Sequence, residues 1–206
     1  MRGRLITLEG IDGAGKSTHL ATVVRFLRRR GIPVKITREP GGTALGESLR
    51  RLLLGKGLSL HPETETLLMF AARREHMRKV IAPALAAGKW VVCDRFTDAT
   101  YAYQAGGSGV AWEKVRRLED WVQGKMQPDL TLLFDVSPAI ARRRAGGRRR
   151  RDRFESEKQS YFLRVRAAYL RRVRESRGRI RVIDAKGTIA IVKLKLEEIL
   201  LRFCNK

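Results

Sequence analysis

The chain has 206 residues, a length typical of one domain with a sizeable hydrophobic core. Its 44 Lys and Arg residues outnumber 21 Asp and Glu residues, which gives a formal net charge of +23. Such a charge favours the binding of polyanions such as nucleotides or nucleic acid. Solvated surface arginines are the simpler explanation for most of the excess. No apolar run reaches the roughly 18 residues of a membrane span. Residues 1–5 run directly into a predicted strand, so we expect no signal peptide. Cys93 and Cys204 lack the spacing of a disulfide or a metal site, and we therefore expect a cytoplasmic protein.

The first motif along the chain is a phosphate-binding loop. Residues 10–17 match the pattern G-x-x-x-x-G-K-[ST] at every fixed position. Its glycines let backbone N–H groups point at an anion, Lys16 adds a charge for the terminal phosphates, and Ser17 offers a hydroxyl to the Mg²⁺ that accompanies ATP. A strand predicted over residues 5–8 and a helix after the loop make a chance Gly-Lys-Ser turn the weaker explanation. The residues expected to bind ATP are Gly10, Ile11, Asp12, Gly13, Ala14, Gly15, Lys16, Ser17 and Thr18.

The second predicted strand, over residues 32–37, ends in a polar turn. Arg38 follows it directly, so we expect this arginine at the C-terminal edge of the sheet, where open α/β sheets bind ligands. Pro40 and the glycines after it predict a turn. Thr43 is then the predicted N-cap of the next helix.

A long helix is predicted over residues 62–87, with a kink at Pro83. Phe70 and Arg73 lie three residues apart, so both side chains can face the same side of this helix. Ordinary core packing explains Phe70 equally well, and a surface charge is the simple alternative for Arg73.

The third predicted strand, residues 90–95, carries Asp94 and Arg95 at its C-terminal end. A carboxylate after four apolar residues is typical of a Walker-B site, which reaches Mg²⁺ directly or through water. Arg95 strengthens this prediction, because a guanidinium binds phosphate oxygens in a bidentate manner. A segment rich in hydroxyl and aromatic side chains follows, with Thr100, Tyr103 and Gln104, and residues 106–109 are predicted to form a loop.

The rest of the chain continues to alternate between helices and strands. Helices are predicted over residues 112–122 and from Ser137–Pro138, and strands over residues 130–135 and 180–184. This alternation predicts one domain over residues 1–206, with a three-layer α/β/α fold around a five-stranded parallel sheet.

An arginine-rich segment follows the fourth strand. Eight of the 12 residues from 142 to 153 are arginine, so the segment cannot pack as core. One interpretation is a solvated basic loop that contacts nucleic acid. The phosphate loop favours the other, a lid over residues 142–155 that nucleotide phosphates draw shut, with nucleic-acid binding at most non-specific.

Six short motifs together resemble the thymidylate kinase family over nearly the whole chain. They are EGIDGAGKST at residues 9–18, REPGGT at 38–43, FAAR at 70–73, DRF at 94–96, AYQ at 102–104 and DRFE at 152–155. The resemblance implies a P-loop fold, Mg²⁺-dependent transfer of the γ-phosphoryl group of ATP to dTMP, and a role in dTTP biosynthesis. It also implies a homodimer, for which the apolar residues 67–69 are the predicted surface.

The resemblance implies contacts to each part of dTMP. Asp12 would hold the 3′-hydroxyl, and Arg38 and Arg95 would grip the phosphate. Tyr103 would fill the space that a ribose 2′-hydroxyl needs. On the base, Phe70 would stack on thymine, and three polar side chains would lie at its edge: Arg73, Thr100 and Gln104.

The catalytic set implied by the resemblance contains Lys16, Asp94, Arg95 and Arg153. Ser17 and Asp94 would bind the Mg²⁺ ion, the latter directly or through water. Gly13 stands where some members carry an arginine in the phosphate loop, so the transition-state arginine is expected from the lid. Arg153 is the first choice, and the alternatives are Arg148, Arg149 and Arg151. The chain also departs from the usual pattern at Phe96, often Tyr, and Ala99, often Ser.

Two other kinds of function fit a phosphate loop. A switch GTPase is disfavoured because no N/T-K-x-D motif follows the fourth strand, whereas the arginine excess keeps a nucleic-acid-stimulated ATPase open. A catalytically inactive nucleotide-binding relative is disfavoured by the intact Lys16, Ser17, Asp94 and Arg95.

Overall fold

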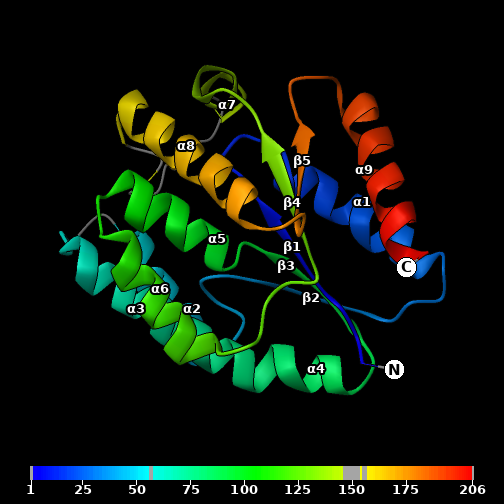
Figure 1. Ribbon diagram of the computed structural model, residues 1–206, viewed down its shortest axis with the longest axis horizontal. Helices are drawn as coiled ribbons and strands as arrows, with labels where there is room; N and C mark the ends of the chain where they lie inside the picture. Colours follow the sequence, from blue (N-terminus) through cyan, green and yellow to red (C-terminus); the bar gives the residue numbers. More distant parts are fainter. Residues whose placement is uncertain (1, 56–57, 146–153, 155–156, 206) are drawn as a thin grey trace.

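A computed structural model describes residues 2–55, 58–145, 154 and 157–205, which form a parallel β-sheet with helices on both faces (Figure 1). Within these residues the sheet has five strands in the order β2-β3-β1-β4-β5, and each neighbouring pair is parallel. The strands are β1 (Leu5–Glu9), β2 (Val34–Arg38), β3 (Trp90–Asp94), β4 (Leu130–Asp135) and β5 (Ile180–Asp184). The predicted three-layer α/β/α fold is therefore confirmed.

Helices cover the two faces of the sheet unequally. Figure 1 shows α1 (Lys16–Arg28) and α9 (Ile189–Cys204) side by side on one face. The other face carries α3 (Pro62–His76), α5 (Thr97–Thr100), α6 (Trp112–Gln123) and α8 (Gln159–Glu175). The remaining helical elements are α2 (Ala44–Leu54), η1 (Met77–Ile81), α4 (Ala82–Ala86), η2 (Tyr101–Gly107) and α7 (Pro138–Ala145).

None of the helices described here is long and apolar enough to cross a membrane.

Strand β1 lies at the centre of the core. All five of its residues are fully buried, as expected for a strand with neighbours on both edges and helices on both faces. The edge strand β2 is partly exposed. It begins at Val34, two residues later than predicted, because its pairing with β3 starts at Val34 and Trp90. Pro33 before it has no N–H to donate to a strand ladder.

Three predicted helix boundaries are informative. Thr43 caps α2 as predicted, since its hydroxyl accepts a hydrogen bond from the N–H of Gly46 at 3.0 Å. Pro138 begins α7, also as predicted. The long helix expected over residues 62–87 is present as the consecutive segments α3, η1 and α4. The wider π-helical turn of η1 ends at Ile81, two residues before Pro83, which cannot donate a backbone hydrogen bond.

The loop predicted over residues 106–109 is wrong for its first half, because Gly106 and Gly107 belong to η2. Both glycines lie against α8. A Cβ atom on Gly106 would lie 2.4 Å from the side chain of Ala168, and one on Gly107 would lie 2.6 Å from the ring of Tyr161. These residues thus serve close helix packing and do not mark a turn.

The segment predicted as a lid begins inside α7. Residues 142–145 are the last residues of that helix, and among the remaining lid residues only Phe154 lies within the described part of the chain. Arg153 and the alternatives Arg148, Arg149 and Arg151 lie outside the described residues.

Candidate functional site

The site lies where the C-terminal ends of β1, β2 and β3 meet. Strand pairing places Leu8 beside Asp94, and Asp94 beside Arg38, so the three ends are adjacent although they are far apart in sequence. The phosphate loop leaves the end of β1 and enters α1 at Lys16. This edge of a parallel sheet is where α/β proteins bind ligands.

Gly13 and Lys16 fix the shape of the phosphate loop. Gly13 has a φ of +85°, and a Cβ atom there would lie 2.2 Å from the carbonyl oxygen of Ala141, so only glycine fits. The ammonium of Lys16 donates to the carbonyl oxygens of Gly10 at 2.7 Å and Ile11 at 3.1 Å. Burial lowers the pKa of Lys16, which is the expected effect on an ammonium that has left water.

A polar cavity faces this loop. It brings together six of the nine residues predicted to bind ATP and both predicted phosphate arginines, whereas Gly10, Ile11 and Ala14 are not in its described lining. That lining is Asp12, Gly13, Gly15, Lys16, Ser17, Thr18, Arg38, Glu39, Arg50, Asp94 and Arg95. Ser17 and Thr18 are exposed in it. We call it the phosphate cavity.

The phosphate cavity contains oxygen atoms suited to a divalent cation. Oδ1 of Asp94 is buried and has no hydrogen-bond partner among the described residues, and the exposed hydroxyl of Ser17 lines the same cavity. Hard cations such as Mg²⁺ prefer carboxylate and hydroxyl oxygens. The two residues predicted to face the metal therefore have donor atoms that fit it.

Arg95 connects the phosphate loop to the end of β3. Its guanidinium donates from Nη2 to Asp12 Oδ1 at 2.7 Å and to the Tyr103 hydroxyl at 3.1 Å. Its backbone has a φ of +68°, an uncommon conformation for a residue other than glycine and one that clusters at functional sites. Burial acts to lower the pKa of Arg95, but Asp12, Tyr103, Tyr169 and Asp94 together outweigh it, and the pKa lies well above its ordinary value.

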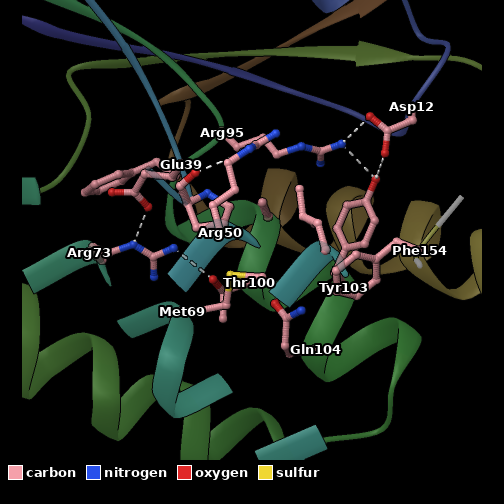
Figure 2. Close-up of a pocket in the computed structure, with 14 residues that line it drawn as sticks. Asp12, Glu39, Arg50, Met69, Arg73, Arg95, Thr100, Tyr103, Gln104 and Phe154 are labelled. Carbon is pink, nitrogen blue, oxygen red and sulfur yellow. Dashed lines mark hydrogen bonds and ion pairs between the residues drawn. The ribbon is translucent and has the colours of Figure 1, made fainter. Parts of the chain in front are cut away.

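A second cavity, shown in Figure 2, continues from the phosphate cavity toward α3 and η2. We call it the base cavity. Its described lining is Asp12, Glu39, Pro40, Arg50, Leu54, Met69, Arg73, Arg95, Phe96, Ala99, Thr100, Tyr103, Gln104 and Phe154. The two cavities share Asp12, Glu39, Arg50 and Arg95.

Arg73 is held rigidly in the wall of the base cavity. It is 2 % exposed, and it donates from Nε to Glu39 Oε2 at 2.7 Å and from Nη2 to the Thr100 hydroxyl at 2.9 Å (Figure 2). Nη1 is buried without a hydrogen-bond partner among the described residues. A buried donor without a partner costs free energy, so Arg73 is prepared to bind an acceptor.

Tyr103 and Gln104 line the same cavity from η2. The Tyr103 hydroxyl donates to Asp12 Oδ2 at 3.4 Å, and its ring packs edge-on against Phe154. Burial raises the pKa of Tyr103 well above its usual value, so this hydroxyl stays protonated. The amide of Gln104 donates to Glu65 Oε1 at 2.8 Å, which leaves its carbonyl oxygen as an acceptor.

Phe70 is not where the resemblance implied. It is 1 % exposed, packs with Tyr101, Val115 and Val122 in a separate part of the core, and is not among the described residues that line the base cavity. Met69, one residue earlier on α3, lines the cavity instead. Phe70 is therefore packed in the core, as the alternative interpretation had it. The side chain of Met69 lies in the cavity wall where the ring of Phe70 was expected.

Glu39, Arg50 and Met69 line the cavities but were not predicted as site residues; Met69 was predicted only as part of the dimer surface. Glu39 stood in a recognised motif, and its position after the second predicted strand was the available signal. Arg50 is half-buried beside the exposed Arg51, and no sequence pattern distinguishes the two. The residues at the two departures from the family pattern, Phe96 and Ala99, both line the base cavity.

Three comparisons identify relatives of this chain. Residues 8–196 match the family model described as thymidylate kinase. A thymidylate kinase of Nitrosomonas europaea is 59% identical over 198 residues, covering 96% of this chain and 92% of that protein, and one of Cupriavidus necator is 59% identical over 202 residues, covering 97% and 98%. The crystal structure of thymidylate kinase from Ehrlichia chaffeensis has a TM-score of 0.79 at 34% identity and covers 98% of this chain and 100% of that one.

Glu9 lies beneath the site, at the end of β1. It is fully buried, and its two carboxylate oxygens accept from the backbone N–H of Phe96 at 2.7 Å and from the Tyr169 hydroxyl at 2.8 Å. Burial, followed by the charge of Asp98, raises the pKa of Glu9 from 4.5 to about 8, while Arg95 acts in the opposite direction. Glu9 thus holds its proton near neutral pH in the folded protein.

Glu9→Gln is expected to remove a pH dependence of stability. The folded protein binds the Glu9 proton more tightly than the unfolded chain, so this group stabilises the fold fully below its unfolded pKa of 4.5 and loses that contribution as pH rises through about 8. Urea unfolding at about pH 5 and pH 8 should therefore favour the variant over the unmodified protein increasingly toward pH 8. The exposed Glu113→Gln is the control, and an equal difference at both pH values for Glu9→Gln contradicts the assignment.

Proposed function

We propose how this site works from the premise that the chain belongs to the thymidylate kinase family. It is a nucleoside monophosphate kinase, which transfers the γ-phosphoryl group of ATP to dTMP and forms ADP and dTDP. One observation supports the placement of the two substrates: the phosphate cavity and the base cavity share Arg95 and Asp12. A monophosphate with its base in one cavity therefore presents its phosphate to the other.

ATP binds with its phosphates in the phosphate cavity. The loop N–H groups and the start of α1 attract the anion, and the Lys16 ammonium exchanges its carbonyl partners for phosphate oxygens. This exchange is favourable because burial has already removed water from Lys16, and a phosphate supplies negative charge that carbonyl dipoles lack.

dTMP binds with its phosphate beside Arg95 and Arg38 and its base in the base cavity. Arg73 is a donor only, so its free Nη1 recognises a keto oxygen on the pyrimidine edge and rejects an amino group. Asp12 accepts from the 3′-hydroxyl. Tyr103 excludes a ribose 2′-hydroxyl because its hydroxyl is fixed between Asp12 and Arg95.

The transfer itself needs no general base, because phosphoryl transfer depends on alignment and charge neutralisation. Arg95 holds the acceptor phosphate in line with the donor, and Lys16 follows the charge on the transferred group. Arg153 of the lid remains our proposal for the transition-state arginine. Ser17 and Asp94 would hold Mg²⁺, directly or through water, and the bound ion neutralises charge on the ATP phosphates.

The active protein is proposed to be a homodimer, formed through α2, α3 and α6. Helix α3 packs against both α2 and α6, and each of the three exposes a large apolar side chain. These are Leu45, Leu52, Leu67 and Trp121, with Leu67 54 % and Trp121 81 % exposed. Within the predicted surface of residues 67–69, Leu67 fits this role, whereas Met69 faces the base cavity. A cytoplasmic location accords with the free Cys93 and Cys204.

Lys16→Ala is expected to lower kcat on the order of 10²- to 10³-fold, because it removes a charge directed at the transferring phosphoryl group. The KM for dTMP should change little, since Lys16 does not line the base cavity as described. Steady-state kinetics with ATP and dTMP measure both, and Lys193→Ala on α9 is the control. An unchanged kcat would mean that this loop does not hold the donor.

Met69→Ala and Phe70→Leu are expected to affect different properties. Met69→Ala removes an apolar wall of the base cavity and should raise the KM for dTMP by about tenfold, with a small change in stability. Phe70→Leu leaves a gap in the core and should lower the free energy of unfolding by about 1–2 kcal/mol with the KM unchanged. If Phe70→Leu alone raises the KM, the ring faces the base after all.

Leu67→Asp is expected to weaken the dimer by at least about tenfold, because it places a charge in an apolar interface. Sedimentation velocity over a range of concentrations measures this. Leu194→Asp is the matched control, since Leu194 is exposed on α9 at the other face of the sheet. A monomeric unmodified protein, or dissociation caused by Leu194→Asp, would contradict the proposed surface.

A further inference from the structure

His76 lies behind the base cavity at the end of α3. It has no exposed surface and does not appear among the described residues lining either cavity. Nothing in the reaction requires an imidazole at this position. Its ring nevertheless forms hydrogen bonds at both nitrogens, and one of them connects it through Glu39 to Arg73.

These bonds form a continuous chain from β2 to the cavity. The Thr37 hydroxyl lies 2.6 Å from His76 Nε2, His76 Nδ1 lies 3.0 Å from Glu39 Oε1, and Glu39 Oε2 accepts from Arg73 Nε at 2.7 Å. A carboxylate only accepts hydrogen bonds, so Nδ1 is the donor to Glu39. In the neutral ring Nε2 then accepts from the Thr37 hydroxyl, which fixes the orientation of the ring.

The bond from His76 limits how Glu39 can bind Arg73. Without it, both oxygens of Glu39 can pair with Nε and Nη2 in the side-on bidentate arrangement that a guanidinium favours. Nη2 would then leave Thr100, to which it now donates at 2.9 Å, and the guanidinium would turn. With Oε1 turned toward His76, the Glu39 carboxylate presents only Oε2 to the guanidinium, at Nε, and Thr100 keeps Nη2.

We propose that His76 is a positioning residue that acts through Glu39 to aim the free Nη1 of Arg73 at the pyrimidine edge, and so contributes to the selection of a keto over an amino pyrimidine. The inference rests on the proposed placement of the base in this cavity. Burial supports it, because Arg73, Glu39 and His76 are each at most 5 % exposed and no bulk water replaces a missing bond.

Two near-isosteric variants separate the bonds of His76. Asn places its amide nitrogen near the position of Nδ1 and keeps the donor to Glu39, whereas Gln reaches toward Thr37 and loses it. We expect His76→Gln to raise the KM for dTMP, and to lower the preference for dTMP over dCMP, by about tenfold, with kcat and the KM for ATP within about twofold. His76→Asn should stay within about twofold of the unmodified protein in all four.

A double substitution tests whether His76 acts through Glu39. In a Glu39→Gln background, His76→Gln should have no further effect on the preference for dTMP over dCMP. Independent, multiplying effects would overturn the inference. The inference would also be overturned if His76→Gln lowers kcat and raises the KM for both substrates in proportion to a fall in melting temperature, because this is the pattern of a purely structural role.

Arg73→Gln distinguishes this inference from the proposed function. If it leaves the preference for dTMP over dCMP unchanged, the proposed placement of the base is wrong and the inference falls with it. If Arg73→Gln abolishes the preference while the Gln and Asn variants of His76 behave alike, the placement stands and the role of His76 is overturned.

Discussion

The ion pair between Asp12 and Arg95 joins the two halves of the site. Asp12 belongs to the phosphate loop and Arg95 follows β3, yet their side chains meet at 2.7 Å. Burial opposes the charge of Arg95, and the Asp12 carboxylate is the first of several neighbouring groups that together outweigh this effect on its pKa. Because both residues line both cavities, this pair lies at the boundary between the phosphate cavity and the base cavity. The remaining site residues are arranged on either side of it.

The parallel sheet makes this arrangement possible. In a parallel sheet all strands end at the same edge, so β1, β2 and β3 bring the phosphate loop, Arg38 and Arg95 together across crossover helices. The backbone of Arg95 then turns into the left-handed region, and bonds to its neighbours hold it there. Its N–H donates to the carbonyl of Leu8, and the next N–H donates to Glu9. The bond from Phe96 to Glu9 thus helps to fix the backbone next to Arg95.

The features that the sequence predicted well depend on local patterns. Motif spacing and hydrophobic periodicity predict the phosphate loop and the strand ends, and the structure contains both. The choice between Met69 and Phe70 could not be made this way, because residues three and four positions before Arg73 lie on the same helix face. Only the packing of Phe70 against α6 and η2 decides it. Arg50 was missed for a similar reason, since its neighbour Arg51 has the same chemistry.

The arginine excess also has a structural component that composition alone does not reveal. Asp98 is fully buried and pairs with Arg172 of α8 at 2.9 Å and with Arg179 at 2.8 Å. Burial acts to raise the pKa of Asp98, but the two arginines outweigh it and lower the pKa. Arg166 makes two bonds to Asp135 at the end of β4. The pairs of Arg172 and Arg166 therefore hold α8 to α5 and to the end of β4.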